Sequence, residues 1–305
     1  MGDLLGIVFN QVALMCILML AGGIAYWQKW IDDVGVKQIS NFLLYIVNPM
    51  TIIAAYQTEF SIDKLLVLGK TFVVGMIILA ATLLFVRIVL KGLDCIEQYG
   101  IAFANCGFIG IPLVKAVLSD GAVFHLSAFL VAVNFVVWTY GIYMITKDKK
   151  YMTIQKAIVN PGTIGTLLGL LLFISPLKLS PLLYNGVSTL GNLNTPLAMI
   201  ILGAYIVKSN VKTMVSSKRL YAICFLRLII LPLLTLAVLV LLPIHDYTIA
   251  MTVFIASSAP AAVNTMIFSL QFGGDSELGA RIVSMTSLLS MVTLPIILSI
   301  GNMLL

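Results

Sequence analysis

The chain has 305 residues, of which 61% are apolar and only 10% are charged. This composition excludes a soluble protein with a single core, because one core cannot bury so much apolar surface. The net charge of +6 would suggest nucleic acid as a partner for a soluble protein. Here the basic residues fall mainly in short loops between apolar stretches, so the lipid bilayer is the expected partner and nucleic acid is not.

Ten apolar stretches follow one another along the chain, each near the length of about 20 residues that a helix needs to cross a bilayer. They cover residues 4–27, 38–57, 66–90, 96–118, 122–146, 158–175, 187–207, 220–242, 247–270 and 278–304. The first stretch opens with an acidic Met1-Gly2-Asp3 and has no small-residue cleavage site after it. We therefore expect a retained helix and not a secretion signal.

The basic residues give the orientation. Of the 18 Lys and Arg residues, 13 lie in or beside the loops after the first, third, fifth, seventh and ninth stretches, and 4 lie on the other side. Cytoplasmic loops are the ones enriched in Lys and Arg. The pattern predicts a multi-pass protein of the cell membrane with both termini outside the cytoplasm.

Two motifs recur at nearly the same separation. Asn48-Pro49 and Thr195-Pro196 lie 147 residues apart, and Pro112 and Pro260 lie 148 residues apart. This predicts two five-helix repeats, residues 1–146 and 158–305, joined by a basic link at 147–157. Five is an odd number, so the second repeat is inverted in the membrane. The alternative is that the prolines recur by chance.

The fourth and ninth stretches each contain residues that weaken a helix near its middle. Gly107, Gly110 and Pro112 do so in the fourth stretch, and Pro260 does so in the ninth. Freed backbone groups cannot face lipid, so they must be buried in protein or line a cavity. If the two breaks cross, half-helix amino termini meet at mid-membrane and bind an anion without a fixed cation. The alternative is two kinks in packed helices, with Asn105 and Asn264 as interhelical hydrogen-bonding groups.

The candidate residues follow from these breaks. The expected substrate contacts are Asn105, Cys106, Gly107, Ser258, Asn264 and Thr265, and the expected crossover residues are Gly110, Pro112 and Pro260. The accessory candidates are Asn48, Asn134, Thr195 and Arg227. Arg227 lies about two turns into the eighth stretch and has two interpretations: it snorkels to the interface, or it attracts the anion or braces the mobile unit. Trp138, one turn after Asn134, is expected to pack.

The sequence shows no sign of enzyme chemistry or of a cofactor. Its acidic residues all fall in loops or at the ends of stretches, no His or Cys pair has metal-ligand spacing, and no Walker glycine loop occurs. A cation-coupled carrier normally needs an ionisable group in the membrane. A sodium- or proton-coupled symporter is therefore the alternative and not the first choice. If the carrier is coupled, Glu97 or Asp120, carboxylates at the ends of stretches, are the candidates to bind the cation.

Four segments carry a family resemblance: Asn105–Lys115 (NCGFIGIPLVK), Asn160–Leu172 (NPGTIGTLLGLLL), Thr195–Tyr205 (TPLAMIILGAY) and Asp275–Pro295 (DSELGARIVSMTSLLSMVTLP). They resemble the auxin efflux carrier family, with its bacterial malate and malonate permeases. The resemblance implies an all-α fold of the bile-acid symporter and NhaA type, with ten helices, crossed fourth and ninth helices, elevator motion and a homodimer. It also implies that Asn105 contacts the substrate. Because the long cytoplasmic loop of the plant carriers is missing, the expected cargo is a small carboxylate such as malate or malonate, not auxin.

Overall fold

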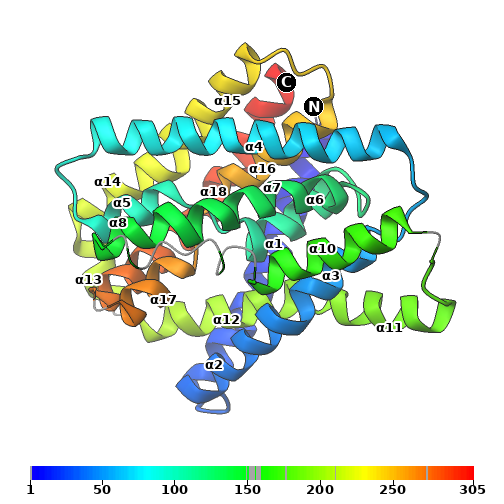
Figure 1. Cartoon of the computed structure of the whole chain (residues 1–305). Helices are drawn as coiled ribbons and strands as arrows, with labels where there is room; N and C mark the ends of the chain where they lie inside the picture. The colour runs from blue at the N-terminus through cyan, green and yellow to red at the C-terminus, as the bar shows by residue number, and fades with distance from the viewer. Residues whose placement is uncertain are drawn as a thin grey trace.

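The computed structural model describes residues 2–148, 150, 155, 159–175, 177–209, 211–272 and 274–305. Within these residues the chain is helical, and its only β-type pairing is one isolated antiparallel bridge. The expected link at 147–157 falls largely outside the described residues. In Figure 1 the two chain termini lie close together at the top, above the crossed bundle.

The first half contains eleven described elements. They are α1 (Gly2–Trp27), α2 (Asp33–Phe42), η1 (Leu43–Val47), α3 (Asn48–Ala55), α4 (Ile62–Val89), α5 (Cys95–Ala102), η2 (Cys106–Gly110), α6 (Ile111–Val117), α7 (Ala122–Val136), η3 (Val137–Gly141) and α8 (Ile142–Thr146). The elements named η are single π-helical turns. η1 joins α2 to α3 in one continuous helical segment, Asp33–Ala55.

The described elements of the second half are α10 (Pro161–Ile174), α11 (Pro181–Asn192), α12 (Asn194–Lys208), α13 (Val211–Ser216), α14 (Lys218–Phe225), η5 (Leu226–Ile230), α15 (Leu231–Leu241), α16 (Tyr247–Ser258), α17 (Asn264–Gln271) and α18 (Ser276–Leu304). Polar residues in the loops set where many helices begin, because their side chains accept hydrogen bonds from otherwise unpaired amides. Asp94 and Glu97 form a full capping box at α5, and Asn160 caps α10 directly before Pro161.

Seven helical segments among the described residues are long and apolar enough to cross a membrane, and three shorter apolar helices accompany them. The shorter ones are Cys106–Val117, Pro161–Ile174 and Tyr247–Ser258. Two of these belong to the fourth and ninth predicted stretches, which are broken, and the third falls in the sixth stretch. Each of the ten predicted stretches thus coincides with a helical segment of the structure.

Three of the four named π-turns end two residues before a proline. The proline is Pro49 after η1, Pro112 after η2 and Pro232 after η5. A proline has no amide hydrogen and crowds the preceding turn, and a locally wider turn relieves both problems. Pro112 therefore sits in the first turn of α6 without interrupting the helix. The prediction that Pro112 marks the break is wrong, because the non-helical residues are 103–105.

Candidate functional site at the helix crossing

The fourth and ninth predicted stretches are interrupted, and their interruptions meet. The helix stops after α5 and resumes at η2, and it stops after α16 and resumes at α17. Between them, Ala104 and Ala261 form the antiparallel bridge. The Asn105 amide donates to the Pro260 carbonyl at 2.8 Å, and the Ala262 amide donates to the Phe103 carbonyl at 2.9 Å. Each broken segment thus satisfies backbone groups of the other, as buried backbone must.

A cavity of about 170 Å³ borders the crossing. Its lining contains asparagines from several separate segments of the chain: Asn41, Asn48, Asn105, Asn134, Asn160 and Asn264. None of the described residues that line it carries a charge. The site therefore offers amide groups and backbone dipoles in an otherwise apolar wall.

Asn105 is the best-placed of these side chains. It is only 5% exposed and caps η2, where its Oδ1 accepts from the Phe108 amide at 3.3 Å. Its Nδ2 has no hydrogen-bond partner in the described part of the chain. A buried donor without a partner costs free energy, on the order of 1–3 kcal/mol. A ligand oxygen in the cavity would remove this cost.

Two helix amino termini meet beside the same cavity. η2 begins at Cys106 and α17 begins at Asn264, whose preceding residue Val263 gives no side-chain cap. The first amides of a helix have no carbonyl partner within it, and each amino terminus carries roughly half a positive charge. Gly107 also lines the cavity, and a Cβ added there would meet nothing within 4 Å. An anion can therefore approach the backbone at this point.

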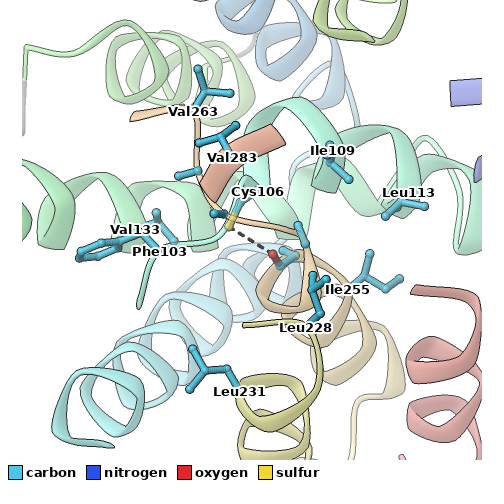
Figure 2. Packing of buried hydrophobic residues seen from close by; sticks show 14 of the residues in the cluster. Phe103, Cys106, Ile109, Leu113, Val133, Leu228, Leu231, Ile255, Val263 and Val283 are labelled. Atoms are coloured by element: carbon cyan, nitrogen blue, oxygen red, sulfur yellow. Dashed lines mark hydrogen bonds between the residues drawn. The ribbon is translucent and has the colours of Figure 1, made fainter. Parts of the chain in front are cut away.

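The remaining predicted contacts lie on other faces of the crossing. Figure 2 shows Cys106 among apolar side chains, and its thiol donates to the Ala256 carbonyl at 3.3 Å, although the residue also lines the cavity. Ser258 is buried but is not part of the described lining. The same is true of Thr265, whose methyl group would lie 3.3 Å from a Cβ at Gly100. These two hydroxyl residues face protein, so the structure does not bring them to the cavity.

The predicted crossover residues have different roles in packing. Pro260 lies in the break and accepts the Asn105 amide, as described above. Gly110 lies against α16, where a Cβ would be 3.6 Å from the Ala256 Cα. Pro112 packs in α6, away from the bridge. The closest approach of the two broken segments therefore comes before Pro112 in the chain.

Of the four accessory candidates, two line the cavity and two, Thr195 and Arg227, do not. Asn134 lines it, and so does Trp138, which the sequence analysis expected only to pack. Asn48 lines it as well and accepts a hydrogen bond from Asn194. Thr195 is outside the described lining, and it is its neighbour Asn194 that bonds to Asn48.

The sequence analysis missed Asn41 and Asn160. Asn160 carried a usable signal, since Asn160-Pro161 repeats the Asn48-Pro49 dipeptide at the start of another apolar segment. Its Oδ1 accepts from the Thr163 amide at 3.0 Å, so this residue both begins α10 and lines the cavity. Asn41 lies in a polar stretch of α2 with no motif to mark it.

Arg227 lies behind the crossing. It is 2% exposed and is not among the described residues that line the cavity. Its guanidinium donates to the carbonyl oxygens of Ile101, Ser257 and Ala259. The snorkelling interpretation is wrong, because the side chain points into protein and bonds to both broken helices.

The two carboxylates left open for coupling are both paired. Glu97 is 1% exposed and is held by two nitrogens of Arg219, whereas Asp120 is exposed and lies 3.3 Å from the Lys115 ammonium. Neither lines the cavity. Within the described ranges, no group of three or more His, Cys, Asp or Glu residues is placed to hold a metal ion.

A family model described as "Membrane transport protein" matches residues 7–298, so the match includes both broken helices and the cavity. A comparison with curated proteins finds no match.

Proposed function

We propose that this chain, which belongs to the membrane transport protein family that contains auxin efflux carriers and malate- and malonate-like permeases, is a secondary transporter of a small organic anion. The cargo is a carboxylate such as malate or malonate. The protein is a multi-pass membrane protein, and its family is one of transporters and not of enzymes.

One observation carries the choice of an anion. The Asn105 Nδ2 donor is buried and unpaired within the described chain, at a cavity where two helix amino termini converge. Every polar feature named here donates hydrogen bonds or carries partial positive charge, and an anion satisfies all of them together. The uncharged lining would also allow release of the cargo, because the site would hold the charge of the anion by dipoles and not by an opposite charge.

The transport cycle that we propose is an elevator motion. The ten segments form two inverted five-helix repeats with both termini outside the cytoplasm, and the chain works as a homodimer. The crossed helices carry the cavity past the segment Asp33–Ala55. A second apolar cluster lies beside this segment: Tyr56, at its carboxyl end, packs with Phe124 and Phe173, and Ile52 belongs to both the cluster and the cavity lining.

The test is uptake of radiolabelled malate and malonate into proteoliposomes by the Asn105→Ala variant. We expect uptake to fall by up to about 100-fold while the protein still folds, because the variant removes a donor to the anion, and the lost cap on the Phe108 amide costs only about 1 kcal/mol. Asn185→Ala is the matched control, since Asn185 is exposed on α11. Uptake by Asn105→Ala equal to that of the control would remove Asn105 from the site.

The same vesicles separate an uncoupled carrier from a cation-coupled symporter. Uptake is measured with and without an imposed sodium or proton gradient. We expect the rate to depend on the gradient of the carboxylate alone, since no described residue of the cavity lining is a carboxylate, histidine, lysine or arginine. Uptake that requires a sodium gradient would favour the symporter.

A further inference from the structure

Arg227 connects three helices at the centre of the molecule. From η5, its Nε donates to the Ala259 carbonyl at 3.0 Å, one terminal nitrogen donates to the Ile101 carbonyl at 3.0 Å, and the other donates to Ala259 at 2.7 Å and to Ser257. Ile101 belongs to the last turn of α5, and Ser257 and Ala259 belong to the end of α16. One guanidinium therefore binds the carboxyl ends of both first half-helices.

These carboxyl ends have the opposite polarity to the ends at the cavity. Each helix carboxyl terminus carries roughly half a negative charge, so the two together nearly balance one guanidinium. The four ion pairs of the described chain do not include Arg227, so no carboxylate competes for its charge. The two amino termini at the cavity then keep their partial positive charge uncompensated.

We infer that Arg227 is a positioning residue that sets the polarity of the anion site: it neutralises and holds the two carboxyl ends, so that the crossing presents net positive charge to the cavity. This inference rests on the proposed function. Arg227 acts through the crossing and does not touch the cargo. It borders a separate cavity of about 20 Å³, together with Thr82, Thr235 and Cys106.

The role predicts an effect that depends on ligand charge. A unit charge about 10 Å away, at an effective dielectric constant of about 20, changes affinity roughly tenfold for each charge on the ligand. Arg227→Gln should therefore weaken binding of the dianion malonate by about 100-fold and of its monomethyl ester, a monoanion, by about tenfold. A residue that only held the fold together would weaken both by the same factor.

The experiment measures the affinity of purified wild-type and variant protein for malonate and for monomethyl malonate at pH 7 by isothermal titration. The expected result is that the ratio of the two affinities falls about tenfold in Arg227→Gln and stays near the wild-type value in Arg227→Lys, which keeps the charge. An unchanged ratio in Arg227→Gln overturns the inference.

Arg227→Lys also serves if Arg227→Gln does not fold. A buried lysine loses its proton at a lower pH than arginine does. Cys106 is the only other titratable residue among the described residues that line this small cavity. Raising the pH from 7 to 9.5 should then lower the affinity ratio of Arg227→Lys and leave that of the wild type, which also contains Cys106, unchanged, whereas a constant ratio in Arg227→Lys refutes the inference. If the wild type binds neither compound nor any other carboxylate of a panel, the proposed function fails and this inference with it; binding with an unchanged ratio refutes the inference alone.

Discussion

Two regions of this molecule bring distant parts of the chain into backbone contact, and they do so in opposite ways. Where α1 meets α12, both helices stay continuous, and Gly203 lets them approach so closely that a Cβ there would lie 1.9 Å from the Met19 carbonyl oxygen. At the crossing, both helices stop, and their peptide groups bond to one another and to Arg227. Close approach by itself therefore does not require a broken helix.

The difference separates stability from function. The α1–α12 contact keeps all its backbone hydrogen bonds within each helix, so it adds packing without exposing dipoles. The crossing leaves four helix ends buried within the protein, which costs free energy unless each end has a partner. Two of these ends have Arg227, and the other two face the cavity. Changes in the first region should remove the fold, and changes in the second should remove transport.

The largest effect is expected at the first region. Gly203→Ala places a methyl group against backbone atoms of α1, which cannot move aside as a side chain can. We expect the free energy of unfolding to fall by about 3 kcal/mol or more, at the upper end of the cost of overpacking. The measurement is thermal unfolding in detergent, in which the fraction of monodisperse protein is recorded at each temperature.

Gly69→Ala is the control for this prediction. Gly69 lies inside α4, and a Cβ there would meet nothing within 4 Å. Alanine is the better helix former, so this variant should melt at the wild-type temperature or slightly above it. Equal melting temperatures for Gly203→Ala and Gly69→Ala would show that the α1–α12 contact is looser than the structure has it.

The next effect concerns the cavity. Gly107→Leu extends a side chain into the space beside the crossing, because Gly107 lines the cavity and a Cβ there finds nothing within 4 Å. We expect uptake of malonate to fall about tenfold or more while the melting temperature changes by less than about 2 °C, since surface-like positions tolerate substitution. Gly186→Leu on α11, where a Cβ also has open space, is the control. A Gly107→Leu carrier with normal uptake would place the cargo elsewhere.

The same two regions show how far the sequence leads. Apolar length located the seven candidate spans and the three shorter apolar helices of the described residues, and glycine and proline located the breaks to within one or two turns. Pro112 misled the placement, because a π-turn absorbs a proline inside a helix and the periodicity of a sequence does not reveal such a turn. The break itself depends on Ala261 of the other half, a contact between residues 157 positions apart that no local pattern contains.

The site shows a similar division. Asn105, Gly107 and Asn264 were predicted from the breaks, and all three line the cavity. Ser258 and Thr265 were predicted from the same short stretch of sequence as Asn264. Neighbouring residues of a helix point in different directions, however, and the sequence does not say which of them face the cavity. The carbonyl partners of Arg227 could not be predicted either, because every residue has a backbone carbonyl and the residue type does not show which one accepts a hydrogen bond.

The smallest effect is expected at the aromatic cluster beside the cavity. The hydroxyl groups of Tyr56 and Ser127 form a buried hydrogen bond of 2.8 Å between the end of α3 and α7. A bond of this kind contributes about 1 kcal/mol. If this end opens during each transport cycle, Tyr56→Phe weakens only the closed state, and exchange of labelled malonate should accelerate by up to about fivefold.

A double-mutant cycle decides whether the bond itself is responsible. We expect Tyr56→Phe and Ser127→Ala each to change the exchange rate, and the double variant to add nothing to Tyr56→Phe alone, because either change removes the same bond. Additive effects would mean that the two hydroxyl groups act separately, through the packing of Phe124 and Phe173 around them. In that case the packing of the aromatic cluster, and not the hydrogen bond, resists the opening. The molecule would then contain a third kind of region, intermediate between the rigid α1–α12 contact and the movable crossing.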